Sequence, residues 1–159
     1  MADERLSRRQ LRENGGLLLR RTPPQAGAPL RPVESSSWSA GWTAFYERHP
    51  DLRPRLEHEE TFPRERLRER LGNLVAPDRE HVLAVSLHGS AEAAGVGAAC
   101  VGGPGAAVSD YVVALFEGGE DDVFVLDEPG GTILLLDQDD EQHPGEVLAQ
   151  RYRWPEFDD

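Results

Sequence analysis

The stretch Leu115–Asp140, LFEGGEDDVFVLDEPGGTILLLDQDD, places two apolar runs between clusters of acidic residues. Short runs rich in Val, Leu, Ile and Phe that are separated by turn residues are typical of β-strands. Pro129 followed by Gly130 fits a type II turn, in which glycine supplies the positive φ, and Gly118 with Gly119 fits a turn likewise. The stretch therefore predicts a β-hairpin whose acidic residues lie at strand ends and turns, where water hydrates them.

Two neighbouring segments extend this prediction. The run DYVVALFEG, Asp110–Gly118, is also rich in strand-forming residues and predicts a third strand, which makes an antiparallel meander of three. The chain ends in EVLAQRYRWPEFDD, a short element from which Trp154 and Phe157 are expected to pack back on the core.

Helices are expected before the meander. Trp38, Trp42, Phe45 and Tyr46 recur at the spacing of one helix face, after serines that can cap a helix and before Pro50. A second helix is predicted over residues 63–71, because proline suits the first helical turn and the glycine at position 72 suits the residue after the last turn.

Two further segments are less regular. Val82, Leu83, Val85 and Leu87 fit a helix or a strand, and the helix is preferred. The segment 91–107 is rich in Ala and Gly and reads as a loop with at most a short strand around Ala98–Val101.

Residues 1–36 combine Arg, Pro, Gly and Ser with few large apolar side chains. Such a stretch buries too little surface to offset the entropy lost on ordering, so we expect a flexible basic arm. Residues 37–159 are expected to form a single domain. Because the helices precede the meander, the predicted fold is segregated α+β, with N-terminal helices packed on an antiparallel β-meander.

Charge is distributed unevenly along the chain. The formal net charge is -12, yet residues 1–36 carry seven Arg against four acids, and residues 101–159 carry fifteen acids against two Arg. Binding of nucleic acid by the folded part is not expected, because phosphates need a basic surface. An acidic surface can instead steer association with a basic protein, although it can also serve solubility alone.

The compartment is expected to be the cytosol. Cys100 is the only cysteine, so no disulfide can form within the chain, and thiols stay reduced in the cytosol. No segment approaches the roughly 20 apolar residues of a membrane span.

Tests for catalytic and metal-binding motifs fail. The acids from Asp137 match the first positions of a calcium loop, but Gln142 and Leu148 stand where that loop needs Gly and Glu. His58 has no second His at zinc spacing, and the Gly-rich GVGAAC and GGPG lack the residues that complete nucleotide-binding motifs. Cys100 is more typical of a small buried residue than of a nucleophile. We therefore expect no enzymatic activity, no cofactor and no metal.

The C-terminal half resembles the SUKH superfamily. The strand–turn–strand pattern of YVVALFEGGEDDVFVLDEPGGTILLLDQDDE is similar to that family's core, and RYRWPEF is similar to its closing aromatic segment. The resemblance extends over about residues 65–157, but the Asn-Gly pair usual in the family is replaced by HGS at His88–Ser90. It implies an α+β fold without an active site, and many bacterial members are immunity proteins that neutralise toxins.

These observations favour a non-enzymatic protein-binding module that binds a basic partner through an acidic face, and the resemblance implies a protein of the immunity type. The predicted contact residues are Glu117, Glu120, Asp121, Asp122, Asp127, Glu128, Asp137, Asp139 and Asp140. Two alternatives stay open. One is an adaptor or assembly component of a phage-like or secretion particle that docks through residues 1–36. The other is a hydrolase or transferase that uses the acidic clusters.

Overall fold

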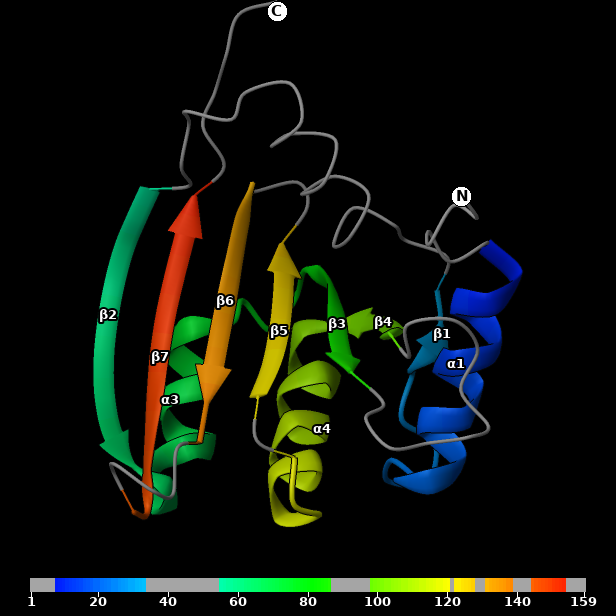
Figure 1. Cartoon of the computed structure of the whole chain (residues 1–159), viewed down its shortest axis with the longest axis horizontal. Helices are drawn as coiled ribbons and strands as arrows, with labels where there is room; N and C mark the ends of the chain where they lie inside the picture. The colour runs from blue at the N-terminus through cyan, green and yellow to red at the C-terminus, as the bar shows by residue number, and fades with distance from the viewer. Residues whose placement is uncertain are drawn as a thin grey trace, which may run out of the picture.

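The computed structural model describes residues 8–33, 55–86, 98–120, 122–127, 131–138 and 144–153. Over these residues the chain forms one antiparallel sheet with the strand order β1-β4-β3-β5-β6-β7-β2 (Figure 1). Its strands are β1 (Arg31–Pro32), β2 (Arg55–Pro63), β3 (Glu80–Ser86), β4 (Ala98–Pro104), β5 (Asp122–Asp127), β6 (Thr132–Asp137) and β7 (Glu146–Arg153). The helices are α1 (Arg8–Arg21), α3 (Leu67–Leu74) and α4 (Gly105–Glu117), with a 3₁₀ turn, η2 (Arg64–Arg66), before α3. The α+β class is confirmed.

The predicted hairpin is present as β5 and β6. Val125 pairs with Leu134 and Leu126 pairs with Ile133 in an antiparallel register. Positive φ falls on Gly131, at 69°, while Pro129 and Gly130 of the predicted turn lie outside the described residues.

The third strand of the meander is β7, and the predicted strand Asp110–Gly118 is wrong. That segment lies in helix α4, where Val108, Val112 and Leu115 are fully buried at the spacing of one helix face. Val and Leu suit a buried helix as well as a strand, so the composition of this short run does not decide between them.

The helix preferred for the segment from Val82 to Leu87 is also wrong, because residues 82–86 belong to strand β3, which pairs with β4 on one side and β5 on the other, while Leu87 lies outside the described residues. In the Gly-rich segment, the short strand expected around Ala98–Val101 is present as β4, which extends to Pro104. A Cβ on Gly103 would lie 2.6 Å from the carbonyl oxygen of Pro29. Glycine is therefore needed where the segment before β1 crosses close to the sheet.

Residues 8–33 differ from the predicted arm, because helix α1 packs along β1 and β4 and places Leu18 in the core, 2% exposed. Gly15 allows this approach, since a Cβ there would lie 2.5 Å from the carbonyl oxygen of Cys100. The hydroxyl of Tyr111 in α4 donates to the carbonyl oxygens of Leu18 and Thr22, at 3.2 and 2.6 Å. The predicted helix around Trp38 to Pro50, like Trp154 and Phe157, lies outside the described residues.

The predicted second helix is present, although it extends further than expected. The 3₁₀ turn η2 and α3 together run from Arg64 to Leu74, so Gly72 lies inside the last turn instead of after it. Leu67, Leu71 and Leu74 are buried on one side of α3.

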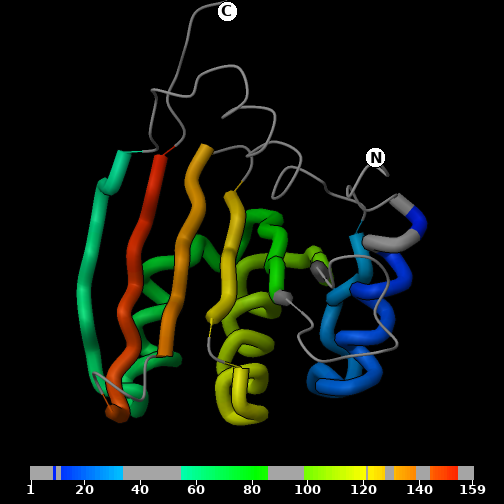
Figure 2. Tube along the Cα trace, in the orientation of Figure 1, coloured from blue at the N-terminus to red at the C-terminus, as the bar shows by residue number. Residues whose placement is uncertain are grey.

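Helices α3 and α4 cover the same face of the sheet, which we call the helix-side face (Figure 1). The main core lies between these helices and the sheet, where Leu83, Val101, Leu136 and Val147, each on a different strand, are fully buried. Segments far apart in the chain lie side by side in this sheet, as β2 and β7 show in Figure 2. Among the described residues, no helix is long and apolar enough to cross a membrane.

Candidate functional site

Four of the nine predicted contact residues gather at one end of the sheet. Glu117 ends α4, Glu120 follows it, Asp122 begins β5 and Asp137 ends β6. Asp122 and Asp137 are direct partners across the β5–β6 ladder. Like charges directly opposite each other in a ladder are unfavourable, so this end of the hairpin concentrates negative charge.

Asp127 is separated from these four because it lies at the other end of β5. Its side chain is buried and forms an ion pair with Arg79. The four remaining predicted contacts, Asp121, Glu128, Asp139 and Asp140, lie outside the described residues. The structure therefore groups only part of the predicted acidic face, and binding through it stays a prediction.

The face of the sheet opposite α3 and α4, here called the second face, is also apolar. Strand residues alternate between the two faces, so the neighbours of the core residues point to this side. Its centre is buried and is formed by Val82, Ala84, Cys100, Leu126 and Ile133. The burial of Cys100, 1% exposed, agrees with a packing role for this thiol.

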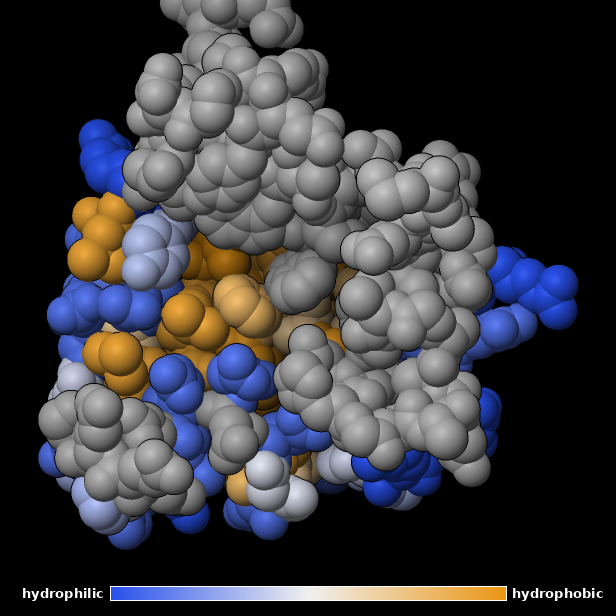
Figure 3. All heavy atoms as spheres, viewed as in Figure 1, coloured by the Kyte–Doolittle hydropathy of each residue, from blue (hydrophilic) through white to orange (hydrophobic). Residues whose placement is uncertain are grey.

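Toward β2 the second face becomes accessible. Phe124, Leu135, Leu148 and Tyr152 are only partly buried, and Leu56 is 46% exposed. Apolar spheres lie between polar ones over β6, β7 and β2 in the view of Figure 3. We call these five residues the outer patch. No helix among the residues that the structure describes covers it.

Acidic groups border the outer patch. Leu148 pairs with Asp137 on one side, and Gln150, which donates to Glu59 at 2.6 Å, pairs with Leu135. Asp122 lies beyond Asp137 in the same row of the ladder. The patch thus combines accessible apolar area with a negative border.

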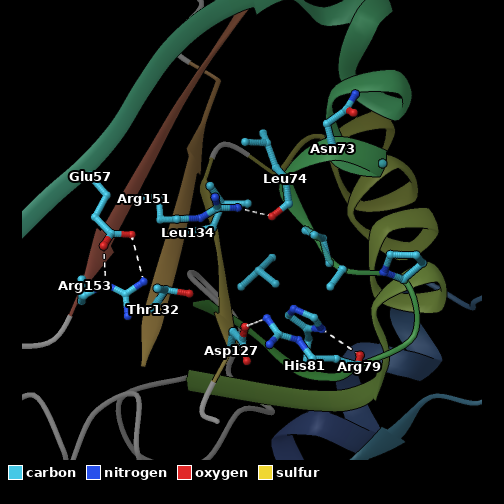
Figure 4. A pocket seen from close by; sticks show the side chains of 15 residues that line it. Glu57, Asn73, Leu74, Arg79, His81, Asp127, Thr132, Leu134, Arg151 and Arg153 are labelled. Carbon is cyan, nitrogen blue, oxygen red and sulfur yellow. Dashed lines mark hydrogen bonds and ion pairs between the residues drawn. The ribbon is translucent and has the colours of Figure 1, made fainter. Parts of the chain in front are cut away.

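A cavity of about 570 Å³ lies on the helix-side face, beyond the last turn of α3 (Figure 4). The cavity forms because α3 ends at Leu74. Beyond that residue, the next row of strand side chains on the helix-side face is not covered by α3. That row is polar: Asp127 pairs in register with Thr132, which pairs with Arg153. The loop that follows α3 forms the opposite wall.

Four charged side chains of the cavity form two ion pairs. Arg79 donates to Asp127, and Arg153 donates to Glu57 through two of its nitrogens. The hydrogen bond from Arg153 is the main reason that the pKa of Glu57 is lowered. Arg151 reaches across the cavity and donates to the carbonyl oxygen of Leu74, the last residue of α3 (Figure 4).

His81 lies in the same cavity and is 4% exposed. Its Nδ1 lies 2.9 Å from the carbonyl oxygen of Arg79. Because a carbonyl oxygen only accepts, Nδ1 must carry the proton, and in the neutral ring the lone pair is on Nε2. The cavity therefore holds donors from arginine together with one histidine whose Nδ1–H donates to the backbone.

The sequence contained a signal for this cavity that the search for known motifs missed. Arg151 and Arg153 are the only two arginines among residues 101–159, which contain no lysine, and both line the cavity. Two arginines at alternate positions of a strand have their side chains on the same face of the sheet. In the strongly acidic C-terminal part of the chain, such a pair indicates a local positive site. Known sequence motifs do not include this pair, because the other residues that line the cavity come from segments far away in the chain.

Among the described residues, no group of three or more His, Cys, Asp and Glu side chains is arranged to hold a metal ion. Comparison of the chain with protein-family models, with curated proteins and with solved structures gives no match.

Proposed function

We propose that this protein is a non-enzymatic binding module that docks a basic protein on its second face. The observation that supports this function is the outer patch with its acidic border. Accessible apolar area rimmed by polar groups is typical of protein–protein contact sites. The negative border would favour a basic partner and speed its association.

The resemblance to the SUKH superfamily would make that partner a toxin and the protein an immunity protein. This remains part of the proposal and rests on the short motifs between Gly118 and Asp139. Its consequence is specific: expression of the protein would protect a cell against one basic toxin, and loss of the outer patch would remove the protection.

The adaptor alternative needs a different experiment from the deletion of residues 1–36. Such a deletion removes Leu18 from the core and the acceptors of Tyr111, so it would damage the fold together with any docking function. Replacement of the exposed Arg12 and Arg20 by Gln tests docking through α1 with less damage.

The test of the proposed function uses two variants of the second face. Asp122→Asn combined with Asp137→Asn removes negative charge from the border, and Leu56→Ser removes exposed apolar area. The matched control is Glu69→Gln combined with Asp110→Asn, which removes the same charge from exposed positions on α3 and α4. A partner captured from the lysate of the source cell at low salt is identified, purified and measured against all four proteins.

We expect the charge variant to slow association several-fold at low salt and to lose this effect at high salt, because screening removes long-range attraction. Leu56→Ser should speed dissociation with little dependence on salt. Equal binding by all four proteins, or a partner that is acidic, would overturn the proposal.

A further inference from the structure

The cavity beside α3 is unbalanced in charge. Arg79 and Arg153 each form an ion pair with a carboxylate, Asp127 and Glu57 respectively. Arg151 instead donates to a neutral carbonyl oxygen, and no ion pair joins it to a carboxylate among the residues that the structure describes. Among the described residues that line the cavity, three guanidinium groups therefore face two carboxylates.

Arg151 is also well placed to bind more than the carbonyl oxygen. A guanidinium offers five N–H donors in a planar fork, and the described contact of Arg151 uses one of them. Its side chain is partly buried between the strand and the end of α3. A partly desolvated cation without an opposite charge is costly, and an anion bound to its fork would offset that cost.

The apolar residues that line the cavity indicate what kind of anion fits. Val75, Val125 and Leu134 are buried apolar residues that line the same cavity. The volume of about 570 Å³ lies within the range of small-molecule sites, which combine apolar walls with a few polar anchors. A ligand that fills it needs one anionic end and an apolar body.

We propose that this cavity binds a small organic carboxylate. Its carboxylate group lies on the fork of Arg151, and its apolar body packs against Val125 and Leu134. A carboxylate matches the one arginine of the cavity that has no ion pair with a carboxylate, whereas a phosphate dianion would bring more negative charge close to Glu57 and Asp127. This site is on the helix-side face and is independent of the docking surface proposed above.

The experiment is isothermal titration calorimetry of the full chain with benzoate, with benzamide and with inorganic phosphate. Benzamide has the shape of benzoate without its charge, so the pair isolates the contribution of the anion. We expect saturable binding of benzoate, at least tenfold tighter than that of benzamide or phosphate, because hydrogen bonds between charged groups are the strong ones.

Two variants locate the binding. Arg151→Gln should weaken benzoate binding by about tenfold or more and leave benzamide nearly unchanged, as expected for the loss of one charge-assisted contact. Thr132→Trp on strand β6 should fill the cavity and prevent benzoate binding. This variant tests the location of the site if Arg151→Gln does not fold. Arg66→Gln, on the surface at the start of α3, is the control and should bind benzoate like the unchanged protein.

Several results would overturn the proposal. These are benzoate binding that never saturates, equal affinity of benzoate and benzamide, tighter binding of phosphate, or unchanged benzoate binding by a folded Arg151→Gln or Thr132→Trp variant. Failure to capture a protein partner on the second face would leave this site unaffected.

Discussion

The two faces of the sheet are built from alternate residues of the same strands, but they differ in how their apolar side chains are covered. On the helix-side face, α3 and α4 cover the apolar residues, and Leu83, Leu136 and Val147 are fully buried. On the second face the apolar residues are buried only at the centre, and Leu56 at the outer edge is 46% exposed. An antiparallel sheet with one solvated face normally shows polar residues on that face. A second apolar face with an accessible edge is therefore a surface suited to contact.

The strongest test of this comparison is the removal of one leucine from each face. Leu115→Ala on α4 leaves a cavity in the main core, and we expect a loss of about 3–5 kcal/mol in the free energy of unfolding. Leu135→Ala on the outer patch should cost no more than about 1 kcal/mol, because that side chain is only partly buried. Urea unfolding of both variants measures the difference. Equal losses would show that the outer patch is part of the core and not a docking surface.

A pair of glycines tests how closely the helix-side face is packed. A Cβ on Gly105, at the start of α4, would lie 1.9 Å from the backbone oxygen of Ala76. Backbone must shift to admit it, so Gly105→Ala should destabilise the protein by about 2–3 kcal/mol. Gly72→Ala in α3 meets no atom within 4 Å and should stabilise by up to about 1 kcal/mol. Thermal unfolding of both variants gives the signs, and a neutral Gly105→Ala would mean that the loop after α3 yields easily.

These positions also show how far the sequence predicts the structure. The β5–β6 hairpin was predictable, because its apolar runs are short, rich in strand formers and separated by glycine. Helix α1 and the full length of β4 were not, since glycines that normally break such elements are used here for close approach, as Gly15 and Gly103 show. The segment of α4 is apolar on nearly every side, so it lacks the polar face that marks a helix. The cavity depends on strand register, which brings Asp127, Thr132 and Arg153 together from three strands.

Tyrosines on the two faces provide a smaller contrast. Tyr111→Phe removes a hydroxyl that donates to the carbonyl oxygens of Leu18 in α1 and of Thr22 just after it, and should cost about 1 kcal/mol. Burial, with a smaller effect of Glu120, raises the pKa of Tyr111 to about 12. Because this folded-state pKa exceeds the unfolded value of about 10, the stabilisation is complete below pH 10 and is lost between about pH 10 and 12. Unfolding of Tyr111→Phe should lack this alkaline loss, and Tyr152→Phe on the outer patch should change stability by less than about 0.5 kcal/mol.

The smallest expected difference in stability is between variants of Glu59 and Glu60, which are adjacent on strand β2. Glu60 points to the helix-side face, where hydrogen bonds from Arg70, at 2.6 and 2.9 Å, lower its pKa together with a contact to His58. The folded-state pKa lies below the unfolded value of about 4.3, so this stabilisation is present above that pH and is lost as the pH falls through the folded-state value. Glu60→Gln should therefore cost up to about 1 kcal/mol at pH 7 and almost nothing in strong acid.

Glu59→Gln, one residue away on the second face, should change stability by less than about 0.5 kcal/mol, because Glu59 is exposed. Urea unfolding at neutral and acidic pH distinguishes the two, and a pH-independent cost for Glu60→Gln would mean that packing, not charge, holds the edge strand.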